Sequence, residues 1–398
     1  MHMGIRAKQF QFILIIITGY LSGCNVSDSG SSSSYGSEGL YKLKEKYQYT
    51  LPAESCIINS IQYFEDSGKH YISILNGVND EIILYDLDRK TQVETIPVPN
   101  LGEQSILFHR MSNLDSIQIA NFFSKPTIFT LNDGGEIVTE FPVYTYVGND
   151  ILSFPISLNS LPVQYFNGEY YIPLRPFTWD SGIDEESFRN YYSYIVIDSL
   201  GNREFRYKLP EIYDHFFWGT TLYKYTASLC PVNGLRNWFF VGHSVDPDIS
   251  LYNLDKLVNK KPIPSKIINS VVPFYEDVKK FKKLVKKINK GKARALAPNS
   301  MNEWARSSSD YGRIVYDPIS DLYLRTVYVR PNLEQVKEGL LAPNYSFIIF
   351  NSDLIWLGET LLPEGYNGEV LFVTEEGIHI NKRSQKGIVF TVLEIVKE

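Results

Sequence analysis

Aromatic side chains that stand beside charged residues are the best candidates in this sequence for contacting a ligand. An aromatic ring next to a carboxylate or an arginine suits a sugar or a peptide that docks across a ring of loops. Such residues flank one turn, open a second predicted unit of strands and precede a third. We take five aromatic residues and one arginine there as candidate ligand contacts: Phe177, Trp179, His215, Trp218, Trp304 and Arg306. The alternative interpretation is that Phe216, Phe217 and Trp218 fill the core.

Familiar catalytic and metal-binding motifs do not occur in the sequence. The six histidines, at positions 2, 70, 109, 215, 243 and 379, show no paired metal-ligand spacing. Nucleophile elbows, phosphate-binding loops and dinucleotide-binding motifs are also absent. An acidic loop with Asp180, Asp184, Glu185 and Glu186 offers oxygen atoms suited to Ca²⁺, but its spacing matches no regular calcium loop. We therefore assign no catalytic residue and expect neither a metal nor a cofactor.

Composition and charge argue for a folded sheet protein without a nucleic-acid partner. The 398 residues include 39 Lys and Arg against 45 Asp and Glu, a formal net charge of −6, whereas nucleic-acid binders are usually basic. The 44% of hydrophobic residues exclude a disordered chain. The 14% of aromatic residues favour β-sheets, where such side chains fit the pleated surface.

One basic segment reads as an amphipathic helix over residues 273–291. Pro273 suits its first turn and Gly291 its end. Apolar residues recur at steps of three and four and form one stripe: Val278, Phe281, Leu284, Val285 and Ile288. The lysines on the other faces include four candidate contacts to an anionic surface: Lys279, Lys283, Lys286 and Lys290. The alternative is an inserted helix that packs its stripe on the domain and leaves its lysines in water.

The amino-terminal residues resemble a bacterial lipoprotein signal. Arg6 and Lys8 precede a short apolar run over residues 10–17, which is too short to span a bilayer. The residues Leu-Ser-Gly-Cys that end at Cys24 resemble the lipobox, and this resemblance implies cleavage after residue 23 and lipidation of Cys24. Asn25 follows instead of Asp, which in that family favours the outer membrane. Residues 24–39 are rich in Ser and Gly and predict a flexible tether. We expect a lipid-anchored protein of the bacterial cell envelope.

The two remaining cysteines, Cys56 and Cys230, lie in apolar surroundings without a motif. An oxidising compartment would permit a disulfide between them. Their surroundings favour two buried thiols.

Hairpins recur along residues 40–398 at the spacing of propeller blades. One pattern occurs five times: a strand with alternating apolar residues, an Asp or Asn turn, and a second strand that ends at proline. The first strand and its turn lie at residues 82–88, 127–135, 194–198, 249–255 and 347–353. Four strands in each unit predict six blades, over residues 51–99, 103–143, 149–210, 211–264, 308–363 and 366–395. The last unit is one strand short, and residues 41–49 are expected to supply its outer strand and close the ring. Seven blades or a pair of β-sandwiches are the alternatives.

The lipobox, the Ser-rich tether and the turns Tyr-Asp-Leu-Asp and Leu-Asn-Asp-Gly-Gly together resemble the Bacteroidota lipoproteins with domain of unknown function 4221. The resemblance implies an all-β, six-bladed propeller and no known activity. We expect a binding or scaffolding module for a glycan, a peptide or an envelope protein, held at the membrane by its lipid anchor. The alternative is an envelope glycan hydrolase or lyase, which would gather two carboxylates, or a carboxylate and a histidine, in one pocket. A third hypothesis is an envelope sensor whose basic helix touches the membrane.

Overall fold

The computed structural model of the 398-residue chain describes residues 36–53, 56–101, 106, 108–122, 126–143, 146–147, 150–151, 153–176, 191–218, 222–268, 270–277, 280–281, 283–284, 287, 290, 292, 300–384 and 387–398. Cys24 and most of the predicted tether lie outside these residues. Among the described residues, none of the helices is both long and apolar enough to cross a membrane.

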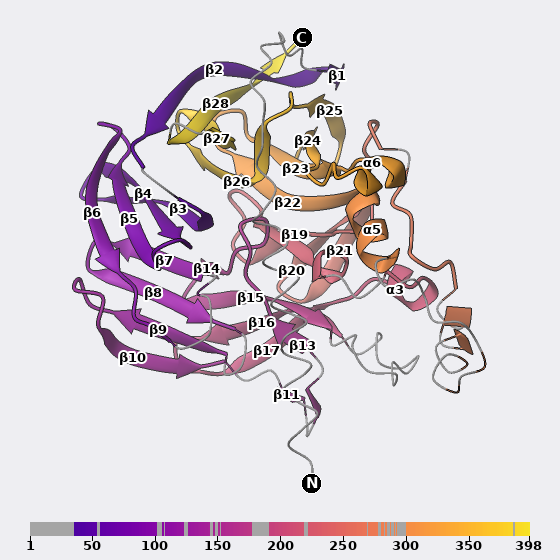
Figure 1. Ribbon diagram of the computed structural model, residues 1–398, viewed down its shortest axis with the longest axis horizontal. Coiled ribbons are helices and arrows are strands. Elements are labelled where there is room, and N and C mark those ends of the chain that lie inside the picture. Colours follow the sequence, from indigo (N-terminus) through magenta and orange to yellow (C-terminus); the bar gives the residue numbers. More distant parts are fainter. Residues whose placement is uncertain are drawn as a thin grey trace.

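Antiparallel sheets arranged around an axis form the molecule (Figure 1). Blade 1 consists of β3 (Ile58–Asp66), β4 (Lys69–Asn76), β5 (Glu81–Asp86) and β6 (Thr91–Pro97). Blade 2 consists of β7 (Phe108–Asn113), β8 (Ser116–Asn121), β9 (Thr127–Leu131) and β10 (Ile137–Pro142). The short pair β11 (Tyr146–Val147) and β12 (Asp150–Ile151) precedes blade 3.

The inner edge of blade 3 is formed by two short strands. β13 (Ser153–Pro155) and β14 (Gln164–Phe166) pair with opposite ends of β15 (Glu169–Pro176). The blade continues with β16 (Tyr192–Asp198) and β17 (Arg203–Lys208). The segment between β13 and β14, residues 156–163, is named the blade 3 loop below.

Blades 4 to 6 complete the ring. Blade 4 consists of β18 (Ala227–Pro231), β19 (Trp238–His243), β20 (Asp248–Asn253) and β21 (Lys256–Pro262). Blade 5 consists of β22 (Asp310–Asp317), β23 (Leu322–Val329), β24 (Asn344–Phe350) and β25 (Trp356–Leu361). Blade 6 consists of β26 (Tyr366–Thr374), β27 (Gly377–Lys382), β28 (Ile388–Lys397) and β2 (Tyr41–Leu51).

The ring closes through an amino-terminal strand, as the sequence predicted. β2 pairs antiparallel with β28 and is the outer strand of blade 6, so the two ends of the propeller share one sheet (Figure 1). β1 (Gly36–Gly39), which lies in the segment predicted as a tether, pairs with β25 of blade 5. The amino-terminal strands therefore hold two neighbouring blades.

Apolar clusters between neighbouring blades hold the ring together. Each blade from 1 to 5 shares one apolar cluster with the next blade, and a sixth cluster joins blade 6 to blade 1. Aromatic rings meet across these seams, for example Phe240 and Tyr323 with ring centroids 4.9 Å apart. The six seams confirm a six-bladed propeller and exclude the seven-bladed and β-sandwich alternatives.

The two ends of the propeller carry very different connections. Short turns join the strands at one end, and Gly135 in the turn between β9 and β10 shows why they need glycine. Its φ is 80°, and a Cβ there would lie 2.1 Å from the carbonyl oxygen of Pro97. The inner strands begin at the opposite end, which we name the loop end. There the connections carry α3 (Ile212–His215), η1 (Leu222–Tyr225), α5 (Ser300–Ser307) and α6 (Leu333–Lys337).

The predicted basic helix lies in the connection between blades 4 and 5, but it does not begin at Pro273: residues 273–277 are not helical, and Tyr275 forms an isolated β-bridge with Phe217. Residues 280, 281, 283, 284 and 287 are helical, and the ring of Phe281 stacks on Phe217 with centroids 3.9 Å apart. Lys283 and Lys290 are exposed, whereas Lys279 and Lys286 lie outside the described residues. The packing of Phe281 agrees with an inserted helix on the propeller, and the contact of its lysines with an anionic surface stays a prediction.

Candidate functional site

The structure describes four of the six candidate contact residues, and two of these, Trp218 and Trp304, belong to one apolar cluster. Phe177 and Trp179 lie outside the described residues. Trp218 is 1% exposed and packs with Tyr213 and Tyr225, so it fills the core, as the alternative interpretation expected. His215 is exposed at the end of α3, 3.4 Å from the carboxylate of Glu211.

Trp304 and Arg306 lie on α5 at the loop end. The Trp304 Nε1 donates a hydrogen bond to the carbonyl oxygen of Val272 at 3.1 Å, and its ring faces the Lys224 ammonium at 5.5 Å. Trp304 therefore joins two parts of the connection between blades 4 and 5, the segment at Val272 and α5. Arg306, two residues further on, lines a cavity.

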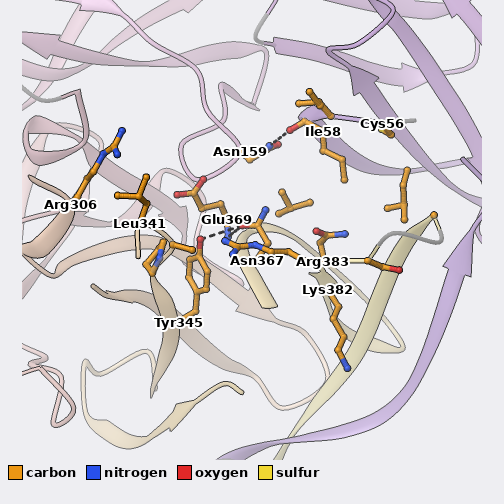
Figure 2. Close-up of a pocket in the computed structure, with 18 residues that line it drawn as sticks. Cys56, Ile58, Asn159, Arg306, Leu341, Tyr345, Asn367, Glu369, Lys382 and Arg383 are labelled. Atoms are coloured by element: carbon orange, nitrogen blue, oxygen red, sulfur yellow. Dashed lines mark hydrogen bonds between the residues drawn. The ribbon is translucent and has the colours of Figure 1, made fainter. Parts of the chain in front are cut away.

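This cavity, named the axial cavity below, lies at the loop end between the inner strands of blades 1 and 6. Its volume is about 410 Å³, within the size range of small-molecule sites. Its walls come from blades 1 and 6 (Figure 2). They include Ile57, just before β3, Ile58 at the start of β3, Asn367 and Glu369 in β26, the last residues of β27 and the first residue of β28. The segment 341–343 before β24 closes one side.

The blade 3 loop reaches across the ring to the axial cavity. The amide nitrogen Nδ2 of Asn159 donates a hydrogen bond to the carbonyl oxygen of Ile58 at 2.7 Å (Figure 2). Its other amide atom, Oδ1, is buried and has no hydrogen-bond partner among the described residues. A buried acceptor without a partner costs free energy unless a bound group satisfies it.

Three charged side chains at the cavity are free to contact a ligand. Within the described part of the chain, the side chains of Arg306, Glu369 and Arg383 form no hydrogen bond and no salt bridge. They come from α5, β26 and the segment after β27, and Figure 2 shows Glu369 between the two arginines. Asn367 is already engaged, since its Oδ1 accepts a hydrogen bond from the Tyr345 hydroxyl at 3.3 Å.

Burial and neighbouring charges shift the pKa of the Glu369 carboxyl. Burial raises the pKa of the Glu369 carboxyl above its usual range, and nearby Asp310 raises it further. The cations Arg330 and Arg383 oppose this shift. Glu369 therefore accepts hydrogen bonds when ionised and can donate one when protonated.

A buried ion cluster fixes the elements next to the cavity. The Asp310 carboxylate lies 3.0 Å from the Lys224 ammonium and 3.0 Å from the Arg330 Nε, and all three side chains are almost fully buried. Burial lowers the pKa of Lys224 to about 8, although Asp310 opposes the shift. The cluster joins η1 to both ends of the β22–β23 hairpin, so it holds blade 5 in register beside the cavity.

The described lining residues of the cavity offer few groups for acid–base or nucleophilic chemistry. Glu369 is the one carboxylate among the described lining residues, and these residues include no histidine. The Cys56 thiol also lines the cavity, but burial raises its pKa to about 12, which leaves it unreactive. Cys56 and Cys230 are both free, as the sequence predicted, and Cys230 is buried. The described residues contain no cluster of metal-ligating side chains.

Sequence reasoning found Arg306 but missed Asn159, Glu369 and Arg383. The signal for Asn159 was weak, because a polar segment between two short apolar runs also reads as an ordinary turn. Glu369 is a charged residue in an inner strand, where buried residues are expected. This conflict with the strand pattern could have indicated a functional residue.

The fold and its cavity define a six-bladed β-propeller with a polar site at the loop end. No protein-family model matches the sequence, and no curated protein matches it. Among solved structures, a member of the DUF4221 family from Bacteroides vulgatus is 17% identical, with a TM-score of 0.71 over 90% of this chain and 99% of that chain. The expected similarity to this family is therefore confirmed at the level of the fold.

Two further solved structures match with lower TM-scores. A gluconolactonase from Xanthomonas campestris is 10% identical, covering 94% of this chain and 100% of its own with a TM-score of 0.46. BamB from Moraxella catarrhalis is 11% identical, covering 89% of this chain and 100% of its own with a TM-score of 0.38. At TM-scores below 0.5 these similarities add nothing to the assignment. A fold does not by itself imply a function, so the propeller does not identify a ligand.

Proposed function

We propose that this protein is a ligand-binding propeller of the bacterial cell envelope and that the axial cavity is its binding site. The observation that carries the proposal is the set of unpaired polar groups in one cavity. Arg306, Glu369, Arg383 and the Oδ1 atom of Asn159 converge there from four parts of the ring. Folded proteins normally pair buried polar atoms such as the Asn159 Oδ1, and the partly buried Arg306 and Glu369 and the exposed Arg383 stand at the same cavity, so their convergence supports a site that a polar ligand completes.

The position of the cavity supports the same proposal. It lies at the loop end, where the long connections and α3, η1, α5 and α6 gather, while short turns join the strands at the opposite end. Loops on a rigid scaffold are the usual carriers of binding residues. A glycan or a peptide of the envelope is the expected ligand. An envelope hydrolase or lyase remains the alternative, but it would need a second acid or base beside Glu369.

A cavity-filling variant tests the binding site. The purified full-length protein is screened by thermal unfolding against a panel of neutral oligosaccharides, acidic oligosaccharides and short peptides. Leu341→Trp places a large ring in the cavity wall and is expected to abolish any stabilisation found. Leu340→Trp is the matched control, because Leu340 is 51% exposed and does not line the cavity. Stabilisation that survives in Leu341→Trp would place the binding site elsewhere.

The location in the envelope rests on the lipobox-like residues that end at Cys24. We expect mass spectrometry of the amino-terminal peptide to find acyl chains on Cys24. The Cys24→Ser variant should lack them and leave the membrane fraction, because acyl chains provide the anchoring free energy. An unmodified amino terminus in the wild-type protein would contradict the anchor and leave the cavity proposal unaffected.

A further inference from the structure

The unpaired groups of the axial cavity divide into donors and acceptors. The guanidinium groups of Arg306 and Arg383 only donate hydrogen bonds, and their planar geometry matches a carboxylate. The Oδ1 atom of Asn159 only accepts, and so does ionised Glu369. A ligand that completes the site therefore needs an acid group for the arginines and separate hydroxyl or amine donors for the two acceptors.

The charge balance of the cavity favours a ligand with a net negative charge. Among the described lining residues, three are cationic, Arg306, Lys382 and Arg383, and one, Glu369, is a carboxylate. The Lys382 ammonium lies over the ring of Tyr366, 5.6 Å from its centroid, and Figure 2 shows its side chain directed away from Glu369. Lys382 therefore adds to the positive potential, while the two arginines are left to make direct contacts.

We propose that the ligand is a sugar acid, that is, a sugar ring with one carboxylate and several hydroxyl groups. This inference rests on the proposed function and deepens it. A sugar acid carries one negative charge and lowers the positive charge of the cavity, whereas a free α-amino acid is neutral overall and leaves that charge unchanged. A neutral sugar would supply the donors but leave both arginines without an anion. A volume of about 410 Å³ is at the small end of ligand cavities, which suits a short sugar unit.

Paired probes test the inference. The full-length protein is titrated calorimetrically with D-galacturonate, with D-galactose, which has a hydroxymethyl group in place of the carboxylate, and with an acidic dipeptide. We expect galacturonate to bind at least about tenfold more tightly than galactose, since charge-assisted hydrogen bonds are stronger than neutral ones. The variants Arg306→Met and Arg383→Met should each weaken galacturonate binding by about tenfold and leave galactose binding unchanged.

A cation outside the cavity provides the control for the change in overall charge. Lys337→Met removes an exposed cation from α6 at the same end of the propeller and should leave binding unchanged. Thermal unfolding establishes that each variant is folded.

The outcomes separate the inference from the proposed function. Equal binding of galactose and galacturonate, lost in Leu341→Trp, would overturn the sugar acid and keep the cavity as the site. Tighter binding of the acidic dipeptide would overturn it in favour of a peptide. Galacturonate binding that Leu341→Trp leaves intact would overturn both proposals.

Discussion

A chain that begins at Pro52 is expected not to fold into a closed monomer, because it lacks the outer strand of blade 6. β2 pairs with β28 along its length and buries Leu43 and Leu51, which are 1% and 0% exposed. The loss of one buried leucine side chain costs about 2–5 kcal/mol. A domain has a total stability of only roughly 5–15 kcal/mol. Two such losses, together with the exposed edge of β28, therefore remove most or all of the stability.

Size-exclusion chromatography and circular dichroism check this prediction on chains that begin at residues 36 and 52. The longer chain should be monomeric and unfold in one transition, whereas the shorter chain should aggregate or lack that transition. A peptide of residues 40–52, added during refolding, should restore the monomer. The same peptide with Leu43→Asp and Leu51→Asp is the control and should not. A shorter chain that is monomeric and equally stable would contradict closure by β2.

Mild acid is expected to destabilise the protein strongly, because three histidines are buried in the uncharged form. His109, His243 and His379 are 2%, 4% and 0% exposed. Burial lowers the pKa of His109 to about 4 and those of His243 and His379 to about 3. Each ring nitrogen Nε2 instead meets a hydroxyl, as His243 meets the Ser193 Oγ at 2.9 Å.

The sign of the pH effect follows from the lowered pKa values. An unfolded histidine takes up its proton near pH 6.5, whereas these folded side chains do not until the pH is much lower. Stability is therefore complete above about pH 6.5 and falls with acid, by about 2–3 kcal/mol for each histidine at pH 4.5. The sum of about 8 kcal/mol is comparable with the stability of a whole domain.

Denaturant unfolding at pH 7.5, 6.5, 5.5 and 4.5 measures this loss. The variant His109→Gln should reduce the dependence of the unfolding free energy on pH by about one proton. His215→Gln is the matched control, since His215 is exposed, and should keep the wild-type dependence. A free energy that stays constant from pH 7.5 to 4.5 would contradict the buried neutral state.

The sequence was sufficient to predict most of the fold, because period-two alternation and turn residues are local signals. The turn at residues 132–135 formed where Asn, Asp and two glycines stand. Closure by β2 was predictable because blade 6 lacked one strand and residues 41–49 alternated as an outer strand would. β1 was not, because Gly36–Gly39 has the composition of a linker and becomes a strand through its pairing with β25.

The candidate site was much less predictable than the fold. Asn159, Arg306, Glu369 and Arg383 belong to blades 3, 5 and 6 and to their connections, and closure of the ring brings them together. No periodic pattern marks single polar residues of this kind. The aromatic residues were ambiguous for a different reason, because rings that fill a seam between blades have the same composition as rings that contact a sugar. Trp218 is of the first kind.

Methyl NMR of the full-length protein labelled at isoleucine tests the central claim, that the axial cavity binds the ligand, most directly. Ile57, Ile58 and Ile388 line the cavity, whereas Ile319 lies at the opposite end of the propeller, in the turn between β22 and β23. On titration with D-galacturonate, we predict saturable shifts of the methyl signals of Ile57, Ile58 and Ile388 and none at Ile319. Saturable shifts at Ile319 without shifts at the three cavity residues would contradict the axial cavity as the binding site, and no saturable shift at any of these residues would contradict the sugar acid.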